Sequence, residues 1–461
     1  MRKRHQQNRI LILGSLGVFA LAAWILLAGA PAFTSLPQGG GPRLVAIEPL
    51  PEMDMSGEMC QWMPVSASEQ EALFALLQQP AAPPTAASMN ADDGPRMTIE
   101  RPPLRVIKDP YPTYSAVAVD MVNNEIVLQD ENLFQIMAYD RMTNTPPSAT
   151  MSEPKRVIGG HNTNMEFNCG LYIDPKNGDI YSVNNDTLNT LVIFSREKRG
   201  DVPPTRELET PHGTYGIAVD EGAEEMFLTV QHASSVVVYR KYAQGEEKPI
   251  RTIVGNKTMM ADPHGIALDT KNGWMFVVNY GNYAAYREGE ERSGGGGSGG
   301  TGRVPGSGKF FPPSITVYPI KANGDVAPIR TIQGPKTQMN WPGHMAVDET
   351  TGMLYVANDG GNSVLAFKVT DGGDVAPARV IKGPRTGIKN PTGVFVDTKN
   401  KEIVVANMGN HQATVYDLTA NGDVPPKRVI RAAPADHPAL QIGNPGAVAY
   451  DTKRDEILVP N

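Results

Sequence analysis

Short apolar segments with alternating hydrophobic and polar positions recur along the chain from about residue 96 to its end. One unit consists of residues 391–397, 402–407, 413–417 and 426–430, with Gly, Asn and Asp between them. Alternating or β-branched segments of this length, bounded by turn residues, predict β-strands. The unit therefore predicts four antiparallel strands, which we call A to D in chain order.

The unit recurs at a spacing typical of β-propeller blades. An Asp closes strand A seven times, at Asp120, Asp174, Asp220, Asp269, Asp348, Asp397 and Asp451. Strand D has a repeated feature as well, an Arg two residues before an aliphatic residue. It occurs seven times, at Arg105, Arg156, Arg206, Arg251, Arg330, Arg379 and Arg428. Most Asp spacings are 46–54 residues, and the one longer interval contains a Gly- and Ser-rich insert at 281–313. These counts predict an all-β fold, a seven-bladed β-propeller.

The two ends of the repeat region predict a shared closing blade. The last unit stops at Asn461, at the end of its strand B, and lacks strands C and D. Residues 96–100 and 103–107 have the pattern of a strand C and a strand D without a preceding A or B. Pairing the two halves would remove the open sheet edge that a linear array exposes. We therefore expect residues 96–461 to form one ring closed by a split blade.

Other recurring residues have architectural explanations. Each strand-A Asp can accept a hydrogen bond from the backbone two residues on and so fix the A–B turn. Glycines four positions before the Asp would let the inner strands approach closely; they are Gly170, Gly216, Gly265 and Gly393. The Asn-Gly-Asp stretches at 323–325 and 421–423 predict tight C–D hairpin turns. The strand-D arginines would protect the outer edge from pairing with other chains.

The N-terminal segment predicts export from the cytoplasm. Four basic residues within 2–9 precede an apolar run at 10–30, which as a helix would be about 31 Å long and could cross a bilayer. The basic flank should stay in the cytoplasm and the propeller outside it. The run is either a single-pass anchor or a signal cleaved near residues 30–32, which would leave a secreted or periplasmic protein. Residues 31–95, rich in Pro, Ala and Met, have the composition of a linker.

Composition narrows the classes of partner. The net charge is −7 and no run of Lys or Arg follows the first residues. This argues against nucleic acid, because its binding needs a clustered basic surface. The two cysteines are Cys60 and Cys169. In an oxidising compartment they would either pair, tying the linker to the propeller, or remain separate thiols.

The repeat unit resembles the NHL repeat. The resemblance rests on Pro391-x-Gly-Val-x-Val-Asp397, on the strand that ends in Asn407 and on Asn410-His411. It covers about 80% of the chain. It implies a propeller and leaves the activity open, because one fold hosts many functions.

The face that collects the D–A and B–C connections is the candidate site. An amide or acid comes ten residues after most strand-A Asp residues, and the third blade, taken as one residue longer, offers Gln231. The set is Asp130, Asn184, Gln231, Asn279, Asn358, Asn407 and Asn461. These side chains would either cap strand ends and bridge water or bind a ligand at the channel mouth. Ca²⁺ is the cation whose preference for oxygen ligands fits them best.

The histidines gather at the same connections. All seven after residue 100 fall in or beside loops of this face: His161, His212, His232, His264, His344, His411 and His437. Of these, His212, His264 and His344 come from consecutive blades near the start of strand A, and three imidazoles with an open position are typical of catalytic Zn²⁺. Pro263-His264 also resembles a zinc-binding Pro-His slot of peptidyl-α-hydroxyglycine lyase. The other two histidines fit this slot less closely. His344 is displaced by one residue from the corresponding position, and a short insertion follows His212.

Two functions are consistent with this face. The first is a non-enzymatic binding or scaffolding module for a protein, glycan or small ligand. The aromatic residues of the insert, Tyr283, Tyr286, Phe310 and Phe311, would overhang the face and contribute to recognition. The second is a metal-dependent lyase or lactone hydrolase at the channel mouth. Metal content separates the two, because a catalytic metal site needs stoichiometric metal.

Overall fold

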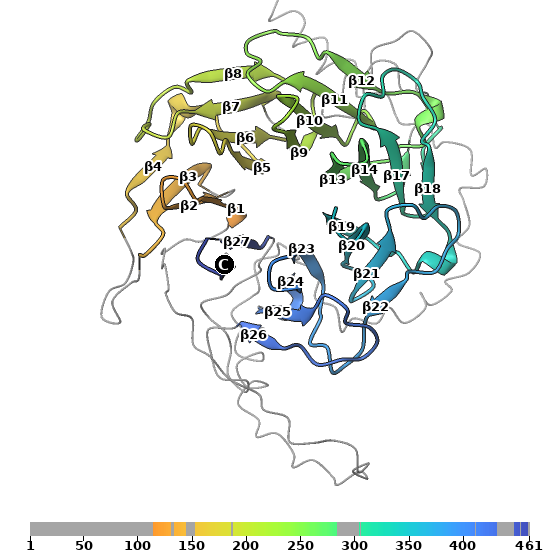
Figure 1. Ribbon diagram of the computed structural model, residues 1–461. Coiled ribbons are helices and arrows are strands. Elements are labelled where there is room, and N and C mark those ends of the chain that lie inside the picture. The colour runs from red at the N-terminus through yellow and green to blue at the C-terminus, as the bar shows by residue number, and fades with distance from the viewer. Residues whose placement is uncertain are drawn as a thin grey trace, which may run out of the picture. The chain divides into compact units, whose positions relative to one another are not determined.

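Six four-stranded antiparallel sheets follow one another around a ring (Figure 1). The computed structural model describes residues 114–130, 133–143, 153–185, 188–283, 304, 306–410, 412–430, 447–451 and 453–459. Within these ranges the regular structure is β-strands with four short 3-10 helices. The prediction of an all-β propeller is therefore confirmed. We number the sheets as blades 1 to 6 in chain order; strand A is innermost and strand D outermost in each (Figure 1).

The strands of the first three blades have these bounds, in the order A to D. Blade 1 has β1 (Tyr114–Asp120), β2 (Glu125–Asp130), β3 (Gln135–Asp140) and β4 (Arg156–Gly159). Blade 2 has β5 (Asn168–Ile173), β6 (Ile180–Asn184), β7 (Thr190–Phe194) and β8 (Arg206–Glu209). Blade 3 has β9 (Thr214–Asp220), β10 (Glu225–Val230), β11 (Ser235–Arg240) and β12 (Arg251–Ile253).

The next three blades repeat the arrangement. Blade 4 has β13 (Pro263–Asp269), β14 (Trp274–Asn279), β17 (Ser314–Pro319) and β18 (Arg330–Gln333). Blade 5 has β19 (Pro342–Asp348), β20 (Met353–Asn358), β21 (Ser363–Lys368) and β22 (Arg379–Ile381). Blade 6 has β23 (Pro391–Asp397), β24 (Glu402–Asn407), β25 (Gln412–Asp417) and β26 (Arg428–Ile430).

The remaining elements are short. β15 (Asn282–Tyr283) pairs with β16 (Lys309–Phe310) at the base of the insert, and β27 (Ala449–Asp451) pairs with β28 (Glu456–Leu458). The 3-10 helices are η1 (His161–Thr163), η2 (Asn256–Thr258), η3 (Pro335–Thr337) and η4 (Met408–Asn410).

The roles predicted for the repeated Asp and Gly residues are confirmed. In all seven repeats the Asp carboxylate accepts a backbone N–H from two or three residues on; in blade 6, Asp397 Oδ1 accepts from Lys399 N at 2.9 Å. The glycines allow neighbouring inner strands to touch. A Cβ on Gly216 would lie 2.6 Å from the His264 carbonyl oxygen, and one on Gly265 would lie 2.7 Å from that of Gly343. Any side chain there would push two blades apart.

The prediction of tight C–D hairpin turns at 323–325 and 421–423 is wrong. In blade 4, β17 ends at Pro319 and β18 begins at Arg330, so the connection is long. It reaches back to the preceding blade instead: Gly324 forms a parallel bridge with Ile253 of β12, and Asp325 Oδ1 accepts from Lys257 N of η2 at 2.7 Å. We call this contact the clip. Equivalent bridges join Gly200 to Ile158, Gly245 to Leu208, Gly373 to Ile332 and Gly422 to Ile381.

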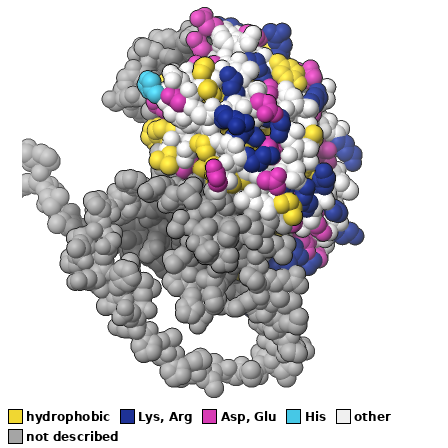
Figure 2. All heavy atoms as spheres, turned by 90° about the vertical axis from the view of Figure 1, so that its left-hand side faces the viewer, with side chains coloured by type: hydrophobic (Ala, Val, Ile, Leu, Met, Phe, Trp, Pro, Cys, Tyr) yellow, Lys and Arg dark blue, Asp and Glu magenta, His cyan; other side chains and the backbone are white. Residues whose placement is uncertain are grey.

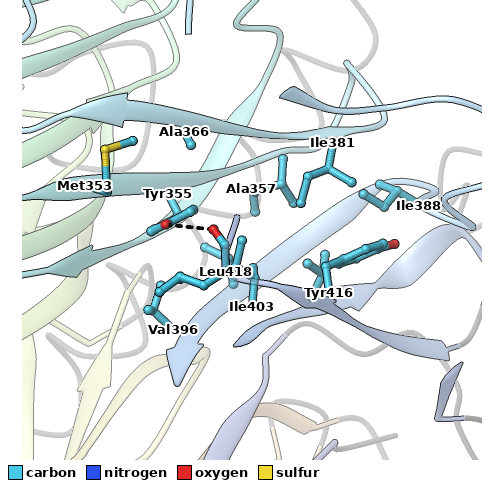
Figure 3. Close-up of a cluster of buried hydrophobic side chains, with 13 residues drawn as sticks. Met353, Tyr355, Ala357, Ala366, Ile381, Ile388, Val396, Ile403, Tyr416 and Leu418 are labelled. Carbon is cyan, nitrogen blue, oxygen red and sulfur yellow. Dashed lines mark hydrogen bonds between the residues drawn. The ribbon is translucent and has the colours of Figure 1, made fainter. Parts of the chain in front are cut away.

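The hydrophobic core lies between neighbouring sheets. Figure 3 shows the layer between blades 5 and 6, where Tyr355 and Ile381 of one blade pack with Ile403 and Tyr416 of the other. All four side chains are buried. The Tyr355 hydroxyl also donates to the carbonyl of Leu418 at 3.3 Å, so the layer is held by a polar contact as well as by burial (Figure 3).

The six strand-D arginines among the described residues have partners within their own blades; their predicted protection of the outer edge stays a prediction. Arg156 donates two hydrogen bonds to the buried Glu125 carboxylate at 2.8 and 2.7 Å, and Arg251 does the same with Glu225. Arg330 instead lies over the Trp274 ring, 4.1 Å from its centre. On the side of the molecule shown in Figure 2, Lys and Arg side chains stand among Asp and Glu side chains. That mixture is typical of a solvated surface.

The two-stranded sheet β27–β28 lies between blades 6 and 1 (Figure 1). Leu458 of β28 is buried together with Ile126, Leu128 and Tyr139 of blade 1. The Arg141 guanidinium is also buried there, with Nε 2.9 Å from Asp451 Oδ2 and a second contact to Glu456. A buried ion pair thus joins residues 310 positions apart in the sequence. The predicted partner strands at 96–107 lie outside the described residues.

Two further predictions fall on residues outside the described ranges. Within the ranges that the structure covers, no helix is long and apolar enough to cross a membrane; the expected anchor at 10–30 is not among them. Cys60 is likewise outside them. Cys169 is in β5, where its thiol donates to the Phe167 carbonyl at 3.5 Å.

We expect Arg141→Met to destabilise the propeller by about 3 kcal/mol, because it removes the buried cation that pairs with both Asp451 and Glu456 and leaves Asp451 with the more exposed Arg454 alone. The measurement is urea unfolding followed by fluorescence. The matched control is Arg240→Met, which removes a more exposed pair with Glu247 and should cost less than about 1 kcal/mol. Equal losses in the two variants would contradict a role for Arg141 in closing the ring.

Candidate functional site

The side chains of the candidate face come from one repeated turn, which the structure shows in five blades. The residue directly before strand A has a positive φ in each: Phe167, Gly213, Asp262, Trp341 and Asn390. Its carbonyl accepts a hydrogen bond from the amide of the residue directly after strand B: Asn185, Gln231, Tyr280, Asp359 and Met408, at 2.8–3.2 Å. We call these two residues of one blade a rim pair. A bulky residue rarely adopts a positive φ, so this geometry is imposed by the fold.

The predicted ring of amides lies behind the rim. Asp130, Asn184, Asn279, Asn358 and Asn407 are each the last residue of a strand B and are fully buried. Asn358 is typical: its Oδ1 accepts from Asn340 N at 2.6 Å and its Nδ2 donates to Ser363 Oγ at 2.8 Å. The four Asn side chains each tie the D–A connection to strand C, which is the capping role. A ligand at the face would meet the rim pairs first. Asn461 is outside the described residues.

The prediction that the third blade is one residue longer is wrong. Asp220 pairs with Glu225 across the A–B turn just as Asp120 pairs with Glu125. The ring position in this blade is therefore occupied by Val230, the last residue of β10. Gln231 follows it and belongs to a rim pair.

His264 is the centre of a polar chain across three blades. Its Nδ1–H donates to the Asp262 carbonyl at 3.1 Å, so its Nε2 accepts from the Gln231 side-chain amide at 2.6 Å. Gln231 Oε1 in turn accepts from Asn185 Nδ2 at 2.9 Å. Burial lowers the pKa of His264 to about 4, although the hydrogen bond to Asp262 opposes that shift. The imidazole is therefore neutral near pH 7.

The three histidines proposed as zinc ligands have separate partners. His212 Nδ1 lies 3.0 Å from Asn189 Oδ1, and its ring packs on that of His232 with centres 4.9 Å apart. His344 Nδ1 donates to the Thr392 carbonyl at 2.9 Å. Both ring nitrogens of His264 are occupied, as described above. Among the residues that the structure covers, no group of three or more His, Cys, Asp or Glu side chains is placed to hold a metal ion. These placements do not fit a shared Zn²⁺ or Ca²⁺.

Three of the other predicted histidines are His161, His411 and His437. His161 is exposed in η1. His411 and His437 lie outside the described residues. The insert contributes Tyr283, whose ring packs on Phe311 with centres 5.2 Å apart, and the exposed Phe310. Tyr286 is outside the described ranges.

Sequence reasoning missed an aromatic and acidic group on blades 4 and 5. Tyr280 stacks on the His264 ring, with centres 3.6 Å apart, and the Trp341 ring lies 5.3 Å beyond it. Trp341 is 52% exposed. Asp262 and Asp359 complete the two rim pairs. We call Asp262, Tyr280, Trp341 and Asp359 the aromatic–acidic patch. Aligning the repeats at the position before strand A would have found Trp341.

The two carboxyl groups of this patch are partly desolvated. Burial raises the pKa of Asp262 to about 6. Burial also raises the pKa of Asp359, and a hydrogen bond from Asn390 Nδ2 at 3.0 Å opposes that shift. Burial raises the pKa of Tyr280, and both carboxylates raise it further. The patch is thus a region of negative potential beside aromatic rings.

The comparisons with known proteins support the fold and leave the activity open. Residues 312–442, less than a third of the chain, match the family "Lactonase, 7-bladed beta-propeller". No curated protein matches the chain significantly.

Among solved structures, hydrazine synthase from Kuenenia stuttgartiensis is similar at 10% identity with a TM-score of 0.50. That likeness covers 77% of this chain and 96% of that one. A functionally unknown protein from Desulfotomaculum acetoxidans is similar at 11% identity with a TM-score of 0.46, over 75% and 88% of the two chains. At such identities the hydrazine synthase likeness shows the propeller fold alone.

We expect His264 to make stability fall as the pH decreases from 6.5 to 4. Its pKa is lowered in the folded chain from 6.5 to about 4, so the unfolded chain binds the proton more readily over that range. The loss at pH 4 should be roughly 3 kcal/mol. Asp262 acts in the opposite direction, because its raised pKa favours the folded state at low pH. The measurement is urea unfolding of the wild type and of His264→Gln at several pH values.

Asp262 is present in both proteins, so the difference between them isolates His264. The wild type should lose its advantage over the variant as the pH falls. Parallel stability curves would show that the imidazole is not buried in its neutral form.

Proposed function

We propose that this chain is an extracytoplasmic propeller, anchored or exported through residues 10–30, which acts as a binding module through the face of its rim pairs. The observation that carries the proposal is the aromatic–acidic patch. Trp341 is half-exposed beside Tyr280, and exposed aromatic residues on a rigid scaffold are typical of recognition surfaces. Two partly buried carboxyl groups adjoin them. A protein, glycan or small ligand are the partner classes.

Binding is favoured over metal-dependent catalysis by the state of His264. A zinc ligand needs a free imidazole nitrogen, and both nitrogens of His264 already form hydrogen bonds. The buried amides of the strand-B ends also have partners within their own blades. The geometry therefore supports a surface that recognises a ligand more directly than it supports a metal-dependent lyase.

Lactone hydrolysis is the second candidate, and the family match at residues 312–442 favours it. Neutral His264 beside the Asp262 carboxylate, with Nδ1 3.7 Å from Oδ1, would be the proton acceptor in such a reaction. Its Nε2 would first have to give up the bond from Gln231. This cost makes hydrolysis the weaker proposal.

For the architecture, we infer seven blades of NHL-like repeats, the last completed by residues 96–107. Arg141 and the buried Leu458 support a seventh position beside blade 1. The matching family is described as seven-bladed. A β27–β28 sheet alone would leave β28 as an unpaired edge, which a strand C from the N-terminal side would cover.

A chain that starts at Pro110, without residues 96–107, should aggregate or melt without cooperativity, because the edge of β28 would be open. Size-exclusion chromatography and thermal unfolding measure this outcome. The control chain starts at residue 93 and keeps both predicted strands. Cooperative melting of both chains at the same temperature would refute the split blade.

A photo-reactive residue at the exposed His344, on the face of the rim pairs, should capture a ligand in cells that produce the protein. Mass spectrometry of the irradiated protein is the readout. The matched control places the same residue at Val122, which is 68% exposed in an A–B turn of the opposite face. We expect adducts at position 344 that disappear when Trp341→Ala is added, and none at 122.

Adducts at both positions in equal amounts would contradict a role for this particular face. Turnover by the purified full chain of γ- or δ-lactones, abolished by His264→Gln and kept by Phe167→Ala, would replace binding with hydrolysis. Stoichiometric metal in the same preparation would restore the metal-dependent alternative.

A further inference from the structure

The aromatic–acidic patch is built from two adjacent rim pairs with their side-chain types exchanged. In blade 4 the residue before strand A is the acid, Asp262, and the residue after strand B is the aromatic, Tyr280. In blade 5 the order is reversed, with Trp341 before strand A and Asp359 after strand B. Each pair is joined by one backbone hydrogen bond of 3.1 Å. The aromatic rings are therefore next to each other, with carboxylates on both blades.

The rings form a continuous surface that ends in solvent. His264 stacks on Tyr280 at an angle of 15°, and Trp341 is tilted by 43° against Tyr280. The neutral imidazole packs on one face of the Tyr280 ring, and the Trp341 ring is exposed to solvent. A ring face carries negative electrostatic potential, which attracts cations.

Within the described ranges, no Lys or Arg side chain forms an ion pair with either carboxylate. Among the described residues, the basic side chain nearest Asp262 is the His264 ring, 3.7 Å away, which is neutral at pH 7. No Lys or Arg of the described ranges lowers the pKa of Asp262 or of Asp359. The buried Glu125 carboxylate, by contrast, is paired with Arg156 and Lys155. Among the described residues, the negative charge of this patch therefore has no cationic partner.

We propose that the aromatic–acidic patch binds an organic ammonium cation, with Trp341 and Tyr280 contacting its alkyl groups and Asp262 and Asp359 balancing its charge. This proposal rests on the proposed binding role of the same face and specifies the ligand. A metal ion is a poor match, because aromatic rings supply no ligand atoms and only two carboxylates are present. An organic ammonium group suits both parts, since its charge is attracted by the carboxylates and the ring faces and its alkyl groups can pack on the rings.

The other rim pairs lack this combination. Blade 2 has Phe167, 49% exposed, with Asn185; blade 3 has Gly213 with Gln231; blade 6 has Asn390 with Met408. Phe167 thus repeats the position, the positive φ and the exposure of Trp341 without a carboxylate in its pair. It supplies a matched control within the same chain.

The test is a calorimetric titration of the full chain with small cations and their neutral analogues at low ionic strength. One arm compares choline with its neutral isostere 3,3-dimethylbutan-1-ol. The other compares Nα-acetyl-lysine methylamide with its Nε-acetylated form, so a free quaternary ammonium is distinguished from a lysine side chain. In at least one arm the charged compound should bind about ten-fold or more tightly than the neutral one.

Variants locate the site. Trp341→Ala should weaken binding of the cation about ten-fold, and Trp341→Phe, which keeps a ring, should restore most of it. Asp262→Asn and Asp359→Asn should each weaken it about three-fold or more at low salt. Phe167→Ala should leave it unchanged. Binding should also weaken as the pH falls from 7.5 to 5 and Asp262 becomes protonated.

Equal binding of charged and neutral compounds, no binding in either arm, or an equal loss in Phe167→Ala would overturn the proposal. The proposed ligand class and the proposed binding role can be contradicted separately. If neither cation binds while photo-capture at position 344 still depends on Trp341, the ligand class is wrong and the binding role stands. If that capture fails as well, the binding role is also removed.

Discussion

The clip between neighbouring blades is the contact on which the whole candidate face depends. In blade 4, Gly324 of the C–D segment pairs with strand D of blade 3, and Asp325 accepts a hydrogen bond from the turn that follows that strand. That turn leads to Asp262 and then into strand A of blade 4. In each blade that forms a clip, the C–D segment therefore fixes the D–A connection through which the chain enters that blade. Both ends of this connection are hydrogen-bonded, one in the clip and the other in the rim pair.

Features that depend on hydrogen bonds within a few residues could be predicted from the sequence. The Asp at the end of strand A fixes a turn two or three residues long, so its role follows from local spacing alone. The bounds of β23 and β24 could be predicted as well, because alternation and turn residues delimit them. The glycines at the inner strands were predictable for a different reason: a Gly four residues before the Asp in four of the seven repeats implies a close contact between inner strands at those positions.

Features that depend on distant residues could not be predicted in this way. Asn-Gly-Asp has the composition of a tight turn, yet its Gly and Asp bind a preceding blade about 70 residues away in blade 4. The strand-B amides are polar residues at strand ends, and only the packing of the D–A connection over them shows that they are buried. A single aromatic residue before a strand has no local signature, so Trp341 stands out only when the repeats are aligned. The spacing of the repeat pairs it with Asp359 as in every rim pair, but only the packing of blades 4 and 5 places Tyr280 beside it.

The aromatic–acidic patch has a consequence for how such a protein can evolve. Propellers grow and diversify by copying whole repeats, and a site contained in one repeat would be copied with it. Here the acid and the aromatic ring of blade 4 face their counterparts from blade 5 in reversed order. Duplication of either blade alone would reproduce only half of the arrangement, and reordering the blades would separate the halves. The arrangement of the patch is therefore encoded across the boundary between two repeats, and it is inherited only when they stay neighbours.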